Sequence, residues 1–130
     1  MSQKPIELIL MRQLASTLAM PIFLVDADGT LVFYNEPAER VLGKRFEETG
    51  EMPPSEWSTL WQPMEADGRP LAPERLPLMI AFSDRKAAHG EFWIQSLDGA
   101  RRQIRATAFP LIRLTDEVVG AVVIFWETAP

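Results

Sequence analysis

Few residues of this chain are of the types that carry out acid–base, nucleophilic or metal chemistry. His89 is the single histidine, and the chain contains no cysteine. An isolated imidazole beside Gly90 is typical of a solvated side chain, so it does not predict a metal site. The P-loop, H-E-x-x-H, G-x-S-x-G and G-x-G-x-x-G patterns are also absent from the sequence. These observations predict a protein that does not catalyse a reaction.

One carboxylate differs from the many that we expect to be solvated. Asp26 follows four apolar residues and immediately precedes a turn, whereas Glu47, Glu48 and Glu51 lie in a polar, turn-rich segment. A buried carboxylate needs hydrogen-bond donors, and backbone N–H groups of the turn can supply them. We therefore expect Asp26 to be structural, fixing the turn and the approach of Asn35.

The elements that position Asp26 are predicted by the residues that follow it. Asp28-Gly29 separates two apolar runs, and both residues tolerate the positive φ that a two-residue hairpin turn requires. Asn35 ends the second run and can accept a backbone N–H that the first turn of a helix leaves free. Segment 21–43 is therefore predicted to form a strand, a two-residue turn, a second strand and a short helix over 37–42.

This order of elements resembles the opening of the PAS domain family, which has a strand ending in Asp, a D-x-G-like turn, a second strand, N-x-x-A and a Gly. The matching residues here are Asp26, Asp28, Gly29, Asn35, Ala38, Glu39 and Gly43. The resemblance continues at Asp67-Gly68, at Asp98-Gly99 and at Val118 to Trp126, so it covers almost the whole chain. It implies an α+β fold, with a five-stranded antiparallel sheet, short helices on one face and an N-terminal amphipathic helix. We expect residues 1–19 to form that helix and residues 20–130 to form the PAS domain.

Apolar periodicity places the remaining elements along the chain. Helices are expected over 6–18, 55–61 and 74–83, and strands over 20–26, 30–34, 88–97, 101–111 and 118–126. The fourth strand alternates, with Arg101, Gln103, Arg105 and Thr107 on one face, which is typical of a half-buried antiparallel strand. The last strand is apolar at nearly every position, so we expect it at the centre of the sheet.

Charge and composition restrict the partners of the chain. The net charge of −5 disfavours direct binding to nucleic acid. The apolar run from Leu8 to Met11 is too short for a membrane span or a signal peptide. We expect a cytoplasmic protein that does not contact a membrane.

The N-terminal helix carries more apolar surface than one contact with its own sheet requires. A core-facing helix usually shows an apolar face of about 100°, and the stripe over 6–18 is wider. The surplus predicts a homodimer, as does the resemblance, because a helix at this place in the family often pairs subunits. The alternative is that the helix only covers the outer face of its own sheet. The predicted dimer residues are Ile6, Ile9, Leu10, Leu14 and Leu18.

Small residues on the inward face of the fourth strand predict a cavity. Ala106 and Ala108 leave room below bulky side chains of the facing helices, and such a concave apolar wall is typical of small-molecule sites. A small apolar or aromatic ligand is expected there, with Thr107 as a further polar anchor. The alternative is a core that the large side chains fill completely. The predicted lining is Tyr34, Asn35, Trp61, Met79, Phe82, Phe92, Ile94, Ile104, Ala106, Ala108, Val123 and Phe125.

The resemblance also bears on cofactors. The absence of cysteine excludes the flavin-adduct and thioester-linked coumarate chemistries of photosensory PAS proteins. The helix over 74–83, where haem-binding relatives usually have the axial histidine, contains none. Ile104 stands where flavin-binding relatives generally have a polar residue. Haem and flavin are thus disfavoured, and no cofactor is assigned.

Together these features predict a non-catalytic sensory or regulatory module. It would bind a small apolar ligand or a protein partner and relay the signal through a dimer to a downstream signalling protein, with regulation of transcription as the expected setting. One alternative is a ligand-free protein–protein interaction module with a filled core. Another is a small cone-shaped α+β enzyme, which would need an acid or base in the pocket. The expected inward positions Ile94, Ile104, Ala106 and Ala108 carry neither.

Overall fold

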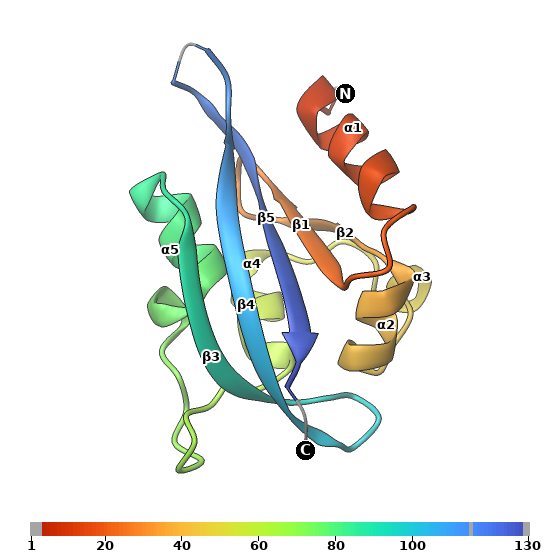
Figure 1. The fold of residues 1–130 in the computed structure, drawn as a ribbon, viewed down its shortest axis with the longest axis vertical. Coiled ribbons are helices and arrows are strands. Elements are labelled where there is room, and N and C mark those ends of the chain that lie inside the picture. The colour runs from red at the N-terminus through yellow and green to blue at the C-terminus, as the bar shows by residue number, and fades with distance from the viewer. Residues whose placement is uncertain (1–3, 115, 129–130) are drawn as a thin grey trace.

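The computed structural model describes residues 4–114 and 116–128, which form an antiparallel sheet with helices on both faces (Figure 1). The helices are α1 (Ile6–Ala15), α2 (Glu36–Leu42), α3 (Phe46–Thr49), α4 (Pro54–Leu60) and α5 (Pro77–Asp84), with a 3₁₀ turn at Pro73–Arg75. The strands are β1 (Ile22–Asp26), β2 (Leu31–Tyr34), β3 (Ala88–Gln95), β4 (Arg101–Ile112) and β5 (Val118–Glu127). The predicted α+β fold is confirmed. Within the described residues, no helix combines the length and apolar character needed to cross a membrane.

The strands lie in the order β2-β1-β5-β4-β3, and every neighbouring pair is antiparallel. The chain therefore places its last strand in the middle of the sheet, as its nearly continuous apolar sequence predicts. Such a strand must be covered on both faces. The alternation predicted for β4 is confirmed as well, because Ile104, Ala106 and Ala108 are buried while Arg101 and Arg105 are exposed.

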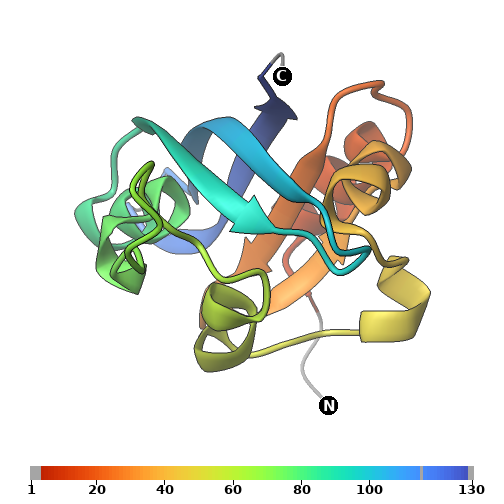
Figure 2. The same cartoon turned by 90° about the horizontal axis from the view of Figure 1, so that it is seen from below.

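Two apolar cores lie on opposite faces of the sheet, and Figure 2 shows the helices on the two sides of the sheet. The larger core packs α2, α4 and α5 against one face, to which β5 contributes Ala121, Val123 and Phe125. The smaller core lies beneath α1 and receives Val122 and Ile124 from the same strand. Because successive side chains of a strand point to opposite faces, β5 is a structural element that both cores share.

α1 is held on the sheet by a close apolar contact and by an ion pair. Leu8 and Ala15 are its buried residues. A Cβ at Gly120 of β5 would lie 2.9 Å from Leu8 Cδ2, so the missing side chain lets the helix approach the central strand. At the same end of the sheet, just after β4, Arg113 Nε donates to Glu7 Oε2 at 3.0 Å. Figure 1 shows α1 beside the strands that it covers.

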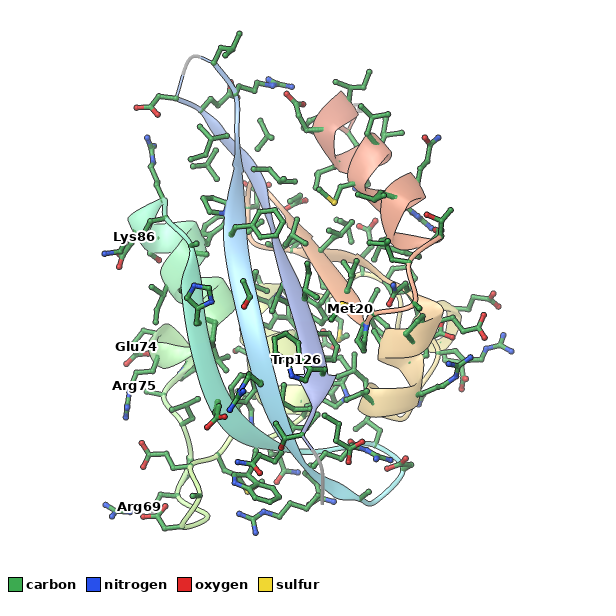
Figure 3. The ribbon with its side chains drawn as sticks, in the orientation of Figure 1. Met20, Arg69, Glu74, Arg75, Lys86 and Trp126 are labelled. Carbon is green, nitrogen blue, oxygen red and sulfur yellow. The ribbon has the colours of Figure 1, made fainter. Side chains whose placement is uncertain are left out.

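The outer face of β3, β4 and β5 carries aromatic and charged side chains. Figure 3 shows Trp126 on the face of the sheet turned toward the viewer, on the side where α1 lies. Trp93 is half-buried on β3, and the guanidinium of Arg101 lies 4.4 Å from its ring centroid. These two tryptophans are on the opposite side of the sheet from the larger core.

The connection between β1 and β2 differs from the predicted two-residue turn. Asp26 N–H donates to Thr30 O at 2.9 Å and Gly29 N–H donates to Asp26 O at 3.0 Å, so residues 27–30 form a four-residue loop. Gly29 has the positive φ of 81°, whereas Asp28 does not have positive φ. The register shifts between Leu24 and Val25. The longer loop and this bulge together replace the tight turn.

Two predicted helices are shorter than expected. α1 ends at Ala15, so Leu18 lies beyond the helix. The helix predicted over 74–83 is divided, because Leu76 is extended with ψ 137° and α5 begins only at Pro77. A residue that precedes proline avoids the helical region for steric reasons, and Pro77 at the first helical position is itself favourable.

Candidate ligand cavity

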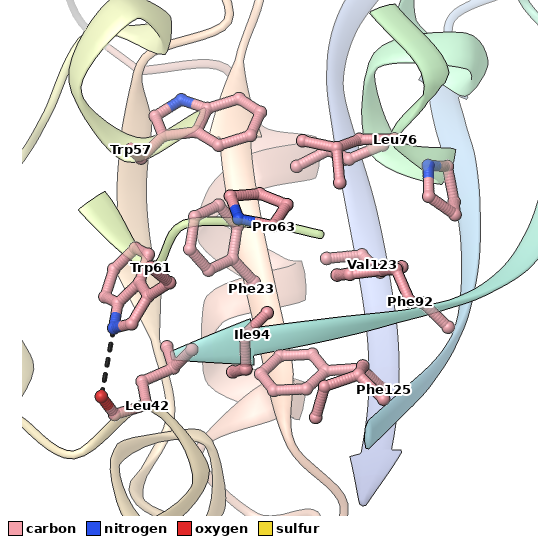
Figure 4. Close-up of a pocket in the computed structure, with 14 residues that line it drawn as sticks. Phe23, Leu42, Trp57, Trp61, Pro63, Leu76, Phe92, Ile94, Val123 and Phe125 are labelled. Atoms are coloured by element: carbon pink, nitrogen blue, oxygen red, sulfur yellow. Dashed lines mark hydrogen bonds between the residues drawn. The ribbon is translucent and has the colours of Figure 1, made fainter. Parts of the chain in front are cut away.

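A cavity of about 80 Å³ lies between the sheet, α4 and the start of α5 (Figure 4). Twelve of its fourteen lining residues are buried, and the two half-buried ones are Pro63 and Phe92, which mark its solvent side. The segment that contains Pro63 runs along the edge of β3. Met64 N–H donates to Trp93 O at 2.8 Å, and Gln95 N–H donates to Trp61 O at 2.8 Å. These bonds fix the rim of the cavity to the sheet.

Seven of the twelve predicted lining residues meet around this cavity. They come from the end of α4 and from β3, β4 and β5, which are far apart in the sequence. The parity of the strands brings them to one face, as the alternation predicts. They are Trp61, Phe92, Ile94, Ile104, Ala106, Val123 and Phe125.

Seven further lining residues were not predicted. Trp57 had a usable signal, because it precedes Trp61 by four residues and so shares its face of a helix. Phe23 alternates with the outward-facing Leu24 in β1, but the apolar run around it hides its direction. The others come from helix ends and irregular backbone, for which periodicity has no signal. The full set is Phe23, Leu42, Trp57, Pro63, Leu76, Pro77 and Leu78.

Tyr34 lies in the larger core and does not line the cavity. Its ring stacks on Phe23 with the centroids 6.1 Å apart. Its hydroxyl donates to Lys44 O at 2.8 Å and lies 3.2 Å from Thr49 Oγ1. Burial raises the pKa of the Tyr34 hydroxyl, and the hydrogen bond with Thr49 opposes this effect. Tyr34 therefore does not occupy the expected lining position, because its phenol holds the segment after α2.

Asn35 does not line the cavity either. The hydrogen bonds of its side chain all go to backbone groups. Oδ1 accepts from Ala38 N–H at 3.1 Å, which confirms the predicted N-cap, and from Ile22 N–H at 3.0 Å. Nδ2 donates to Ala15 O at 2.9 Å and to Met20 O at 2.8 Å. One buried amide thus joins the end of α1, the start of β1 and the start of α2.

The other predicted lining residues lie near the cavity without facing it. Ala108 is fully buried in the larger core, while Met79 and Phe82 pack against that core from α5. Thr107, the further polar anchor expected there, is on the outer face, where its Oγ1 lies 2.9 Å from His89 Nδ1. The division of the predicted helix shifts its first turn, so Leu76 and Leu78 reach the cavity in place of Met79 and Phe82.

Asp26 has the structural role that was predicted for it, although it is half-buried and does not bond Asn35. Its Oδ1 accepts from Asp28 N–H at 2.9 Å and from Thr30 N–H at 3.0 Å. These bonds fix the β1–β2 loop. The backbone of β1 and α1 positions Asn35 instead, through the contacts described above.

The cavity wall is apolar throughout. Among the described lining residues only Trp57 and Trp61 carry a polar side-chain atom, and each indole is already bonded. Trp57 Nε1 donates to Gly29 O at 2.9 Å, and Trp61 Nε1 donates to Leu42 O at 2.9 Å, the bond drawn in Figure 4. No titratable side chain of the described residues lines the space, and no three metal-ligating side chains gather elsewhere in them. The arrangement can accommodate an apolar group.

The predicted dimer residues lie on the solvent side of α1 or just after it. Ile6 is 63% exposed, Leu10 56% and Leu14 49%. Ile9 and Leu18 are also exposed. None of them takes part in the smaller core beneath the helix. These exposed apolar side chains therefore lie close together in the sequence, within the segment from Ile6 to Leu18.

Comparison with solved structures identifies the architecture. The PAS domain of a protein from Colwellia psychrerythraea matches 94% of this chain and 97% of its own, with a TM-score of 0.67 and 18% identity. The chain has the PAS fold. The PAS domain of BvgS from Bordetella pertussis matches 95% of this chain and 87% of its own, with a TM-score of 0.63 and 14% identity.

The PAS fold extends over nearly the whole chain in these comparisons. A LOV protein from Rhodobacter sphaeroides matches 96% of this chain and 69% of its own, with a TM-score of 0.75 and 14% identity. No protein-family model matches the sequence, and no curated protein is significantly similar to it. At these identities the shared property is the PAS fold, and the function must be argued from the residues of the chain itself.

Proposed function

We propose that this PAS domain is a non-catalytic sensory module that binds a small apolar ligand in the cavity and relays occupancy through a homodimer. The observation that carries the proposal is the position of β5. Val123 and Phe125 of this strand line the cavity, while Val122 lies in the core beneath α1. One strand therefore contacts both the ligand space and the helix that presents the dimer surface.

The relay needs two arrangements of the sheet and α1 with different affinities for the ligand. A ligand shifts such an equilibrium only by its difference in affinity for the two states. Gly120 and Leu8 form the contact through which a displacement of β5 reaches α1, because there is no side chain between them. The ion pair of Arg113 with Glu7 provides a second connection between the β4–β5 hairpin and the helix.

A second copy of the chain is the partner that we propose for the exposed face of α1. Leu10→Glu and Leu14→Glu place a charge in that face and are expected to give monomers by sedimentation. Gln13→Glu adds the same charge at another exposed position of the helix and serves as the control. Dimers that persist in both leucine variants would show that this face is not the interface. In the proposed relay, a downstream signalling protein binds one arrangement of the dimer in preference to the other.

Native mass spectrometry of the freshly purified protein tests the proposal as a whole. Twice the chain mass with a discrete increment is the expected result, because it reports the dimer and the ligand together. A dimer without an increment, also after incubation with small apolar compounds, contradicts the ligand. A monomer contradicts the relay.

A ligand-free interaction module is the second candidate function. It is favoured by the volume of about 80 Å³, which is below the range of about 300–1,000 Å³ that drug-sized ligands occupy. This module would use the same α1 surface and would bind no small molecule. The cone-shaped enzyme has no comparable support, because it needs an acid or base in the pocket and the described lining contains none.

A further inference from the structure

The cavity offers a bound molecule no hydrogen-bonding partner among the described side chains. Its walls are aliphatic and aromatic, and the indole N–H groups of Trp57 and Trp61 already donate to Gly29 O and Leu42 O. A water molecule needs two to four polar partners to occupy a cavity stably. The space is therefore suited to a molecule that itself makes no hydrogen bonds.

We propose that the ligand is a neutral hydrocarbon-like molecule, no larger than one ring, without hydrogen-bonding groups. This inference rests on the proposed function and adds to it the chemical class of the ligand. A hydroxyl group would lose its hydrogen bonds to water on entry and find no replacement, which weakens binding. A carboxylate or ammonium group would be left without a counter-charge, because no titratable side chain of the described residues faces the space.

The size limit follows from the volume of about 80 Å³. A dry apolar cavity of about 150 Å³ lined by Leu, Ile and Phe binds benzene or xenon. The present cavity is about half as large, so a single ring already requires a small displacement of the walls. The half-buried Pro63 and Phe92 are the lining residues at the solvent side, where such a displacement is easiest.

The indole N–H groups of Trp57 and Trp61 report on whether a ligand occupies the cavity. Trp57 is bonded to the β1–β2 loop, and Trp61 is bonded to the end of α2, where Leu97 N–H also donates to Leu42 O at 2.9 Å. A ligand that presses on either ring changes the indole N–H bond. Trp93 and Trp126 lie on the opposite side of the sheet, and Trp93, on the edge strand β3, serves as the internal control.

The test is a titration of the ¹⁵N-labelled full chain with benzene, phenol, benzoate and naphthalene, followed by the four indole N–H resonances in NMR spectra. Trp93→Phe and Trp126→Phe assign the two outer signals. We expect benzene to shift the Trp57 and Trp61 signals and to leave the Trp93 signal unchanged. Phenol should bind at least about tenfold more weakly, and benzoate and naphthalene should not bind.

Two variants show whether the binding occurs in the cavity. Ala106→Leu fills the space from β4 and should abolish the benzene shift, and Ala106→Val is the milder substitution if the leucine variant does not fold. Thr107→Val changes the adjacent outward residue and should leave benzene binding unchanged.

The outcomes separate this inference from the proposed function. Tighter binding of phenol or benzoate than of benzene overturns the chemical class, while the cavity and the sensory role stand. Binding of naphthalene overturns the size limit alone. If no compound perturbs Trp57 or Trp61 and native mass spectrometry shows no increment, both the class and the ligand-sensing function are wrong.

Discussion

Leu8 of α1 lies where a side chain at Gly120 of β5 would be. A Cβ at Gly120 would lie 2.9 Å from Leu8 Cδ2 and 2.5 Å from the carbonyl oxygen of Val25. Both distances are shorter than a normal van der Waals contact. The absence of a side chain at Gly120 therefore determines how close the N-terminal helix comes to the central strand and to its neighbour β1.

Gly120→Ala should destabilise the protein by about 1–3 kcal/mol, the usual cost of overpacking a core. The double variant Leu8→Ala/Gly120→Ala should not recover this loss, because the clash with the backbone of Val25 remains. Urea unfolding monitored by circular dichroism measures both. Recovery in the double variant would show that Leu8 is the only obstacle.

Ala106 and Ala108 form a matched pair that tests whether the cavity is real. Both are buried on the same face of β4, but only Ala106 lines the cavity. Ala106→Val fills empty space and should be neutral or stabilising, since unfilled volume costs about 24 cal/mol per Å³. Ala108→Val should cost about 1–3 kcal/mol, because it enlarges a packed site. Equal destabilisation by the two substitutions, measured by urea unfolding, would favour the filled core.

Asn35→Ala should lower the free energy of unfolding by about 3 kcal/mol, because it removes an N-cap and leaves buried backbone groups without partners. Asn35→Asp retains the acceptor for Ala38 and Ile22 but loses both donors, and it places an oxygen against two carbonyl groups. It should also destabilise. A loss below about 0.5 kcal/mol for Asn35→Ala would contradict the junction described here.

The ion pair between Glu7 and Arg113 predicts a pH dependence of α1 docking. The hydrogen bond from Arg113 holds the pKa of Glu7 below its ordinary value of 4.5. A lowered pKa in the folded state means that the contribution is complete above pH 4.5 and is lost as the pH falls through the folded-state value. The difference in melting temperature between the wild type and Glu7→Gln should therefore shrink on acidification.

Glu56→Gln, at an exposed position of α4, controls for the loss of one negative charge. The difference in melting temperature between Glu56→Gln and the wild type should not shrink in the same way on acidification. A Glu7→Gln difference that stays constant from about pH 6 to about pH 3 would contradict the role of the ion pair.

Trp61→Phe should destabilise the protein by about 1–2 kcal/mol, because it leaves Leu42 O short of one buried hydrogen bond. Trp126→Phe, on the half-buried outer face, should change the free energy of unfolding by less than about 0.5 kcal/mol. Guanidinium unfolding followed by circular dichroism avoids the change in fluorescence. Equal effects would show that loss of ring volume, not the hydrogen bond, determines the stability.

The sequence by itself determined the features that depend on neighbouring residues. The alternation of β4, the nearly continuous apolar run of β5 and the cap at Asn35 each predict a local element, because side-chain direction and capping depend on periods of two to four residues. Together they predict the sheet, the central place of β5 and four of the cavity residues, Ile104, Ala106, Val123 and Phe125.

The tertiary structure decided where polar side chains find partners and where space remains. Asn35 bonds Ala15 and Met20, and Trp61 bonds Leu42, over separations of 15 to 20 residues, and no periodicity in the sequence encodes such pairs. The late start of α5 changes which side chains reach the cavity. The volume of the cavity is the small space left where large surfaces pack against one another. It therefore depends on how all the elements meet and not on the residues of any one element.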